Sequence, residues 1–202
     1  DLRGYGDSDK PKTDQMHSPY SKRSMAGDMR EVMRKLGYKT FAVAGHDRGG
    51  RVAHRMARDY PDTITHVALL DIVPTLAMYE KTDKKFSTSY YHWFFLIQPS
   101  PFPETLIKRD PEFFLKHKTN HWGRTAGAIT DEAFSEYLRC FSDPRTIHAS
   151  CEDYRASASI DLEHDQNDFL KKSKMPVFVL WGDAGFVGQN YNVIREWKAV
   201  AT

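Results

Sequence analysis

The sequence predicts an α/β fold, in which buried parallel strands alternate with helices around one helical insertion. Three short apolar segments, 39–45, 65–71 and 176–182, have the composition of strands buried on both faces of a parallel sheet. Apolar residues at helical spacing occur before and after them. No strand pattern is present between Ile72 and about Asn167. Together these observations favour a mostly parallel sheet with a helical insertion at one of its ends.

The N-terminal elements are a loop, a helix and a strand. DLRGYGDSDKP (1–11) is rich in Gly, Asp and Ser and closes with Pro11, which is typical of a loop. From Ser21 onward, apolar residues recur on one helix face, namely Met25, Met29, Val32, Met33 and Leu36. Gly37 ends this helix, and KTFAVAG (39–45) then reads as a buried strand.

The next elements follow without long connections. HDRGGRVAHRMARDYP (46–61) predicts a helix that Pro61 ends, with a buried face made of Val52, Ala53, Met56 and Ala57. THVALLD (65–71) and PVFVLWG (176–182) predict two further buried strands, and NVIREWKAV (192–200) predicts a helix. The aromatic and charged segment between them is expected to form a cap. We therefore predict a core domain in two parts, 1–75 and 169–202, and a helical cap over 76–168.

Composition excludes several classes of protein. The formal net charge of +2 is too small to predict binding to nucleic acid or to an anionic membrane. No run of 18 apolar residues is present, so no membrane span is expected. Cys140 and Cys151 lack metal-type spacing and are expected to be reduced thiols of a cytoplasmic protein. No metal and no cofactor is predicted.

The segment VAGHDRGGRV (43–52) joins a predicted strand to a predicted helix. It departs from the phosphate-binding loop, because Arg51 replaces the lysine and Val52 the hydroxyl residue, and it lacks the dinucleotide fingerprint. It fits a nucleophile elbow, G-x-Nuc-x-G, with Asp47 as the nucleophile between Gly45 and Gly49. The alternative is an aspartate that only caps the helix. The flanking glycines and the strand before them favour the elbow, and glycine is expected to be required at both positions.

An aspartate nucleophile implies a particular reaction. A carboxylate attacks carbonyl groups poorly, but it can displace a leaving group from an sp³ carbon and form an ester on the enzyme. This chemistry predicts halide displacement or epoxide opening. The backbone N–H of Arg48 would supply half of an oxyanion hole for ester hydrolysis. Arg48 and Arg51 lie three residues apart on the helix and are predicted to hold a substrate carboxylate. The alternative is a solvated basic face, because Arg55 and Arg58 continue the run.

Several motifs together resemble the fluoroacetate (haloacetate) dehalogenases of the α/β-hydrolase superfamily: DLRGYGDSDKP, GHDRGGRV, ALLDIVPT, YYHWFFLIQP and CEDYRASASIDLEHD. The resemblance implies an α/β-hydrolase fold and a haloacid substrate, with the carboxylate held by Arg48 and Arg51. It also implies that His92, Trp93 and Tyr154 bind the halide and that Trp122 lines the pocket. By the same resemblance the protein forms a homodimer. From sequence alone, such an aromatic cluster is more often ordinary core packing.

The resemblance also bears on the acid that orients the catalytic base. Asp71, at the end of the second strand, matches it, whereas the rival Asp183 follows Gly182 too closely for the other known arrangement. None of the nine histidines follows a last strand, where the base is normally found. We therefore expect a partial sequence, truncated at both ends of the fold, that could form the ester but not release it. The alternatives are an epoxide hydrolase and a non-catalytic relative that binds a small carboxylate.

Overall fold

The computed structural model describes residues 1–122 and 127–202, and the side chains of residues 120–122 lie outside that description. The chain divides into two compact units. Unit 1 contains Asp1–Tyr20 and His92–Arg155, and unit 2 contains Ser21–Tyr91 and Ala156–Thr202. The predicted limits of the cap, 76–168, stay a prediction.

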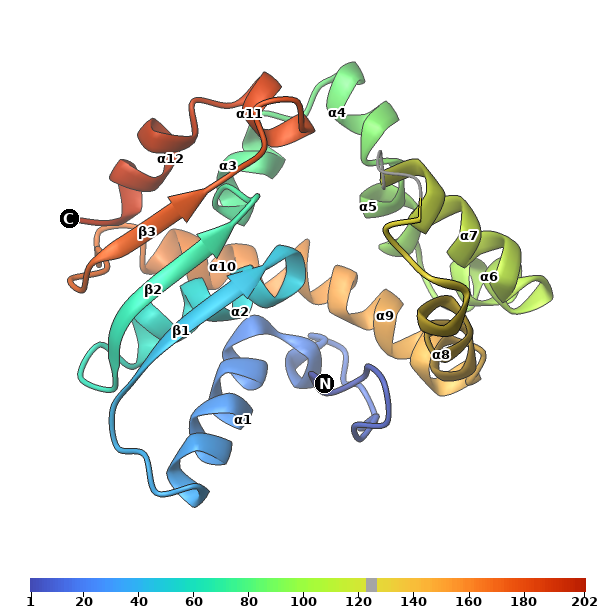
Figure 1. Cartoon of the computed structure of the whole chain (residues 1–202), viewed down its shortest axis with the longest axis horizontal. Coiled ribbons are helices and arrows are strands. Elements are labelled where there is room, and N and C mark those ends of the chain that lie inside the picture. Colours follow the sequence, from blue (N-terminus) through green and yellow to red (C-terminus); the bar gives the residue numbers. More distant parts are fainter. Residues whose placement is uncertain (123–126) are drawn as a thin grey trace. The chain divides into compact units, whose positions relative to one another are not determined.

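Unit 2 contains a parallel sheet of three strands in the order β1-β2-β3 (Figure 1). The strands are β1 (Phe41–His46), β2 (Ile64–Leu70) and β3 (Val177–Leu180). Val67 is the register partner of Val43 on one side and of Val177 on the other. The three predicted strands are therefore confirmed, with ends that differ from the prediction by one or two residues.

The helices of unit 2 include one, α2, that packs against β1 and β2 of this sheet. They are α1 (Lys22–Lys35), α2 (Asp47–Asp59), α3 (Thr75–Glu80), α4 (Lys84–Ser89), α10 (Ile160–Asn167), α11 (Phe186–Asn190) and α12 (Val193–Val200). Helix α2 contacts both β1 and β2, and its ring of His54 meets Trp197 of α12 edge-on, with 5.0 Å between centroids. The predicted apolar face of α2 is almost fully buried, which confirms it: Val52, Ala53, Met56 and Ala57. Each larger side chain of this kind contributes roughly 1.5–3 kcal/mol by burial.

Helix α1 follows its prediction only in part. The Ser21 side chain caps it by accepting a hydrogen bond from the backbone N–H of Ser24, and Met25 is fully buried. Towards the C-terminal end, however, Val32 is 48% and Leu36 is 65% exposed. The spacing of apolar residues identified the helix correctly, but its buried residues lie only in its first half.

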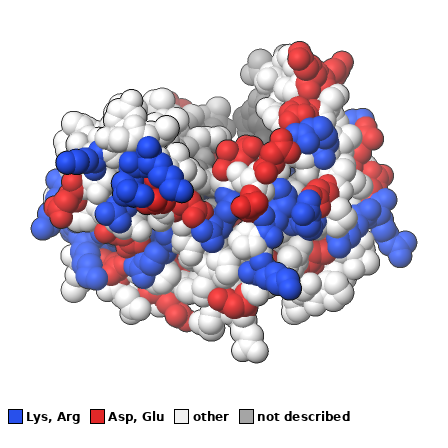
Figure 2. Space-filling view, turned by 90° about the horizontal axis from the view of Figure 1, so that it is seen from below, with Lys and Arg blue, Asp and Glu red and all other residues white. Residues whose placement is uncertain are grey.

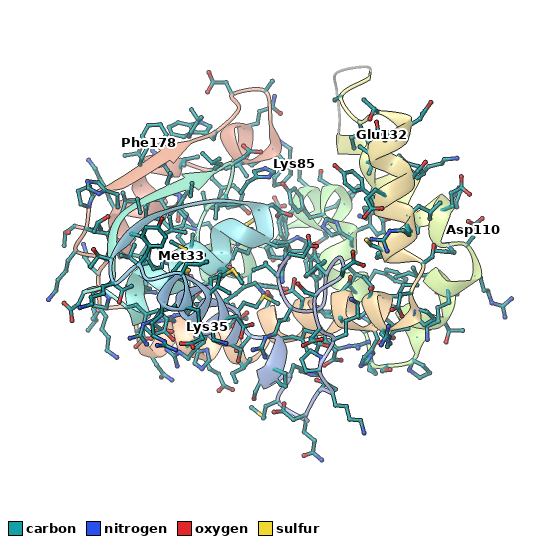
Figure 3. The ribbon with its side chains drawn as sticks, turned by 60° about the horizontal axis from the view of Figure 1, so that its bottom comes forward. Met33, Lys35, Lys85, Asp110, Glu132 and Phe178 are labelled. Atoms are coloured by element: carbon teal, nitrogen blue, oxygen red, sulfur yellow. The ribbon has the colours of Figure 1, made fainter. Side chains whose placement is uncertain are left out.

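The prediction of strands buried on both faces was wrong for this sheet. Alternate side chains of each strand are exposed on the face opposite α2, and Phe178 (59%) and Leu180 (56%) are the largest of them. Figure 3 shows Phe178 on the outer side of β3. A shallow groove of about 400 Å³ runs over this face between Ala42, His66 and Phe178. The strands are apolar on both faces, but the described residues do not cover the face opposite α2.

Unit 1 consists of the N-terminal loop and helices. The loop ends in the short helix η1 (Ser18–Tyr20), and the helices are α6 (Phe102–Arg109), α7 (Pro111–Trp122) and α8 (Asp131–Phe141), with most of α5 (Tyr91–Leu96) and α9 (Pro144–Ser157). Every element described between β2 and β3 is a helix, which confirms the predicted helical insertion. That it covers one end of the sheet stays a prediction.

Surface charge agrees with the small net charge. Basic and acidic side chains are mixed over the face shown in Figure 2. Cys140 and Cys151 both carry free thiols. Among the described helices, none combines the length and the apolar character that crossing a lipid bilayer requires.

Candidate active site

The strand-to-helix turn has the strained backbone of an elbow. β1 ends at His46 and α2 begins at Asp47 without an intervening loop. Asp47 has φ 47°, in the left-handed region that residues with a side chain rarely adopt. Strain of this kind costs about 1–3 kcal/mol and is concentrated at functional sites. The half-buried carboxylate of Asp47 therefore lies at the carboxyl end of β1, where ligands of open α/β sheets bind.

The turn requires glycine at two positions, Gly45 and Gly50, whereas the sequence predicted Gly45 and Gly49. A Cβ atom on Gly45 would lie 2.4 Å from the backbone oxygen of Gly49, so no side chain fits there. A Cβ atom on Gly50 would lie 2.7 Å from Cδ1 of Ile72. At Gly49, by contrast, it would meet nothing within 4 Å. The expectation that Gly49 must be glycine was wrong, because the close approach uses its backbone and the Cα of Gly50.

The guanidinium groups of Arg48 and Arg51 are buried and held by neutral acceptors of unit 2. Arg48 donates from Nη2 to the Ser157 hydroxyl at 2.7 Å. Arg51 donates from Nη1 to the Thr75 hydroxyl at 2.8 Å, and its Nη2 lies 3.2 Å from the sulfur of Met78. Only 9% of Arg48 and 4% of Arg51 is exposed. These contacts help to fix the direction of each guanidinium group.

The next two arginines of α2 have different partners. Arg55 binds the carboxylates of Asp59 and Asp168 at 2.8 and 2.6 Å, and Arg58 donates to the backbone oxygen of Asp168 at 2.6 Å. Both side chains are buried. The alternative of a solvated basic face is therefore wrong, because the far end of α2 faces acidic residues of the segment that follows α10.

Asp71 occupies the end of the neighbouring strand in a similar backbone conformation, with φ 53°. Its Oδ1 accepts a hydrogen bond from the backbone N–H of Gly182, in the loop after β3, at 3.2 Å. The rival Asp183 is exposed. The hydrogen bond from Gly182 fixes the carboxylate of Asp71. Asp71 is therefore better suited than the exposed Asp183 to orient a catalytic base.

Tyr90 is a residue of this site that the sequence did not reveal. Its ring lies 4.8 Å from that of Phe186 and 5.2 Å from that of Phe86, centroid to centroid. Burial and then the charge of Asp47 raise the pKa of Tyr90 to about 12, while Arg51 opposes the shift. The phenol therefore stays protonated beside the elbow. No motif in the sequence distinguishes this tyrosine from its neighbour Tyr91.

The predicted halide-binding residues form one cluster within unit 1. The ring of Tyr154 lies 5.6 Å from His92 and 6.2 Å from Trp93, both edge-on, and all three side chains are buried. The structure thus brings the three together, whereas their role stays a prediction. Trp122 ends α7, and its side chain lies outside the described residues.

The helix that carries Tyr154 is tied to its unit by buried charges. Arg155 donates to Glu104 and Glu152, both at 2.7 Å, and Glu152 also accepts hydrogen bonds from Thr13 and from His17 of the N-terminal loop. Burial raises the pKa of Glu104, but the hydrogen bonds from Arg155 and His148, a backbone hydrogen bond and the charge of Arg155 together outweigh burial and lower the pKa to about 2. Glu104, Glu152 and His148 could together approach a metal ion, yet Arg155 already binds both carboxylates.

This arrangement of strand, strained turn and following helix is that of the α/β hydrolases, and the chain belongs to that family. It matches the alpha/beta hydrolase fold family over residues 1–201.

Within the family, the chain is 44% identical to a fluoroacetate dehalogenase from Burkholderia sp over 198 residues, 98% of this chain and 65% of the relative. It is 32% identical over 210 residues to a soluble epoxide hydrolase from Corynebacterium sp. (strain C12), covering 100% of this chain and 68% of that protein. The crystal structure of ALR0039 from Nostoc sp PCC 7120 has a TM-score of 0.97 at 55% identity, covering 100% of this chain and 69% of that one. The resemblance to haloacetate dehalogenases is thus confirmed. The chain spans about two thirds of the length of these relatives.

Proposed function

We propose that the protein hydrolyses haloacetates, such as fluoroacetate and chloroacetate, to glycolate and halide through an ester on Asp47. The observation that carries this proposal is the combination of a strained aspartate with two buried arginines on the same helix. An anionic nucleophile beside two guanidinium groups suits a substrate that is itself a carboxylate. The 44% identity to a fluoroacetate dehalogenase supports the same substrate class.

In the first step, one Oδ of Asp47 attacks the carbon that bears the halogen. The new C–O bond forms as the carbon–halogen bond breaks, and the halide leaves with the electron pair. Arg48 and Arg51 hold the substrate carboxylate, which offsets its repulsion from the Asp47 carboxylate. His92, Trp93 and Tyr154 carry N–H and O–H donors of the kind that a leaving halide requires.

In the second step, water attacks the carbonyl carbon of the ester on Asp47. Glycolate and the Asp47 carboxylate are released, and one proton goes to a general base. The backbone N–H of Arg48, in the first turn of α2, would bind the developing oxyanion. Asp71 would orient the base, as its hydrogen bond from Gly182 supports.

A second candidate function is the opening of epoxides by the same nucleophile. The 32% identity to a soluble epoxide hydrolase supports it. Arg48 and Arg51 favour the haloacid, because an epoxide offers no carboxylate for them to bind.

An electrode for free halide distinguishes these activities. The full-length protein is incubated with fluoroacetate, chloroacetate and, separately, with styrene oxide. We expect halide release from the acids, reduced by roughly 10³-fold or more in Asp47→Asn. Diol formation from styrene oxide without halide release would replace the proposal with the epoxide reaction. Acetate binding without any product would instead favour a non-catalytic carboxylate-binding protein.

A further inference from the structure

The carboxylate of Asp71 is bordered by a short turn that follows β3. The backbone N–H of Gly182 donates to Oδ1 of Asp71 at 3.2 Å. The N–H of Gly185 donates to the Gly182 carbonyl at 2.9 Å, which closes the turn. A Cβ atom on Gly185 would lie 3.6 and 3.8 Å from the two carboxylate oxygens of Asp71. The backbone of residues 182–185 therefore lies against this carboxylate and limits where it can move.

The turn continues directly into α11, which packs back on it. Phe186 is the first residue of α11 and follows Gly185. A Cβ atom on Gly188 would lie 2.6 Å from the carbonyl oxygen of Gly182, so the backbone of α11 closely approaches the residue that binds Asp71. A shift of α11 would move Gly182 with it. The position of the Gly182 N–H thus depends on what fixes α11.

Three aromatic rings surround the ring of Phe186. Its centroid lies 4.8 Å from that of Tyr90 and 5.9 Å from that of Phe86. The ring of Tyr191, which follows α11, lies 6.3 Å from it. Phe86 and Tyr90 are four positions apart at the end of α4 and stack on each other at 5.2 Å. Since aromatic pairs attract each other beyond the effect of burial alone, Phe186 joins α11 to α4.

This aromatic cluster lies in the electric field of the carboxylates of the site. Burial raises the pKa of Tyr90 to about 12, and the charges of Asp47 and Asp71 add to the rise, while Arg51 opposes it. The rings and both aspartates belong to unit 2. The rings that hold Phe186 are therefore neighbours of the carboxylate that the turn borders.

We propose that Phe186 is a positioning residue, whose ring fixes the turn of residues 182–185 and so holds the Asp71 carboxylate in the direction that the catalytic base requires. This inference rests on the proposed function, in which Asp71 orients the base that hydrolyses the ester on Asp47. It adds that an aromatic contact between α4 and α11 controls the second step of the reaction. Loss of the ring should slow hydrolysis of the ester and leave its formation nearly unchanged.

Four variants of the full-length protein separate the ring from its surroundings. Phe186→Leu removes the ring and keeps most of the apolar volume, whereas Phe186→Tyr keeps the ring. Val187→Ala is the control for general loosening of α11, because Val187 is the next residue of that helix and only 1% of it is exposed. Phe178→Leu is the control for loss of a ring from the same segment, because Phe178 is 59% exposed on β3.

The first readout is hydrogen exchange of the Gly182 amide, followed by NMR. We expect this exchange to be about ten-fold faster in Phe186→Leu, because the aromatic contacts that keep the turn closed are lost. Phe186→Tyr, Phe178→Leu and Val187→Ala should stay within about two-fold of the unaltered protein. Val187→Ala should nevertheless lower the midpoint of thermal unfolding, since it leaves a small cavity.

The second readout is a single turnover of chloroacetate, stopped at intervals and analysed by mass spectrometry of the Asp47 peptide. In Phe186→Leu, decay of the ester should be slower by about ten-fold, while its formation should change by less than about two-fold. Phe186→Tyr should restore the decay rate. General loosening of the fold would instead slow both steps.

The proposal is overturned if the Gly182 amide exchanges as slowly in Phe186→Leu as in the unaltered protein. It is also overturned if Val187→Ala speeds this exchange as much as Phe186→Leu, or if Phe186→Leu slows formation and decay of the ester equally. Hydrogen exchange does not require turnover. A protein that shows the expected exchange pattern but releases no halide would contradict the proposed reaction while supporting the role of Phe186 in fixing Gly182.

Discussion

Two aspartates at the ends of adjacent strands adopt left-handed backbone angles, φ 47° at Asp47 and φ 53° at Asp71. Residues with a side chain rarely adopt these angles, so the surrounding structure must hold each aspartate in this conformation. Asp47 is fixed by the close crossing of Gly45 over the start of α2, and Asp71 by the hydrogen bond from Gly182. The carboxylates that the proposed reaction uses are therefore those whose backbone the fold strains.

Alanine at two glycines of the elbow should have opposite effects. Gly45→Ala places a Cβ atom 2.4 Å from a backbone oxygen, so we expect a loss of more than about 3 kcal/mol in the free energy of unfolding, or no folded protein. Gly49→Ala enters open space inside a helix, where alanine is favoured over glycine by roughly 0.5–1 kcal/mol. Urea denaturation of both variants measures the difference. Equal destabilisation by the two would show that the elbow is packed differently.

Substitution of the two candidate acids separates their roles. These variants are made in the full-length protein, which supplies the catalytic base. In Asp71→Asn, ester formation at Asp47 should continue while its hydrolysis fails, since the base loses its orienting partner. We expect a burst of halide equal to the amount of enzyme, followed by a halt, and an ester on Asp47 detectable by mass spectrometry. The exposed Asp183 serves as the control, and Asp183→Asn should turn over normally. The reverse pattern would transfer the role to Asp183.

At the scale of elements, α2 is fixed at both ends, by its strained turn and by two acidic residues, Asp165 in α10 and Asp168 directly after it. Burial raises the pKa of Asp165 to about 6, against the opposing charges of Arg55 and Arg58. For Asp168, burial is outweighed by hydrogen bonds from Lys171 and Arg55, which lower its pKa to about 2. The contributions of these two carboxylates to the free energy of unfolding should therefore change with pH in opposite directions.

The free energy of unfolding should report this contrast. Asp165 is harder to ionise in the folded state than in the unfolded state, so its contribution falls as pH rises from about 4 to about 6. Asp168 is easier to ionise when folded, so its contribution is present above about pH 4 and is lost as pH falls towards 2.

Urea denaturation from pH 3 to 7 tests this by difference. The stability of Asp165→Asn relative to the unaltered protein should rise between pH 4 and 6, by on the order of 2 kcal/mol. Asp168→Asn should be destabilising at pH 6, and the deficit should shrink below pH 4. Parallel curves for both variants would mean that neither carboxylate has a shifted pKa.

The sequence predicted elements well because their signals are local. Val52, Ala53, Met56 and Ala57 repeat at helical spacing and define the buried face of α2 within one segment. The exposed half of α1 and the open face of the sheet were missed, because exposure depends on which other segments pack there. The partners of Arg48 and Arg51 were missed for the same reason: Ser157 is 109 positions from Arg48 and has no distinctive neighbours.

At the scale of the whole molecule, the chain is an α/β hydrolase in which Asp47, the proposed nucleophile, lies in the same compact unit as Arg48 and Arg51. The cluster of His92, Trp93 and Tyr154 lies in the other, held by buried ion pairs of α9. The sequence identified the elbow from a single motif.

The most direct test of this account is a single turnover of chloroacetate in heavy-oxygen water, with enzyme in excess, followed by mass spectrometry of the Asp47 peptide and of glycolate. Because water attacks the ester at the aspartyl carbonyl carbon, one heavy oxygen should enter the Asp47 carboxylate, and the glycolate should carry the ordinary oxygen that the enzyme supplied. Heavy oxygen in glycolate, with Asp47 unlabelled, would mean that water displaces the halide directly and that Asp47 is not the nucleophile.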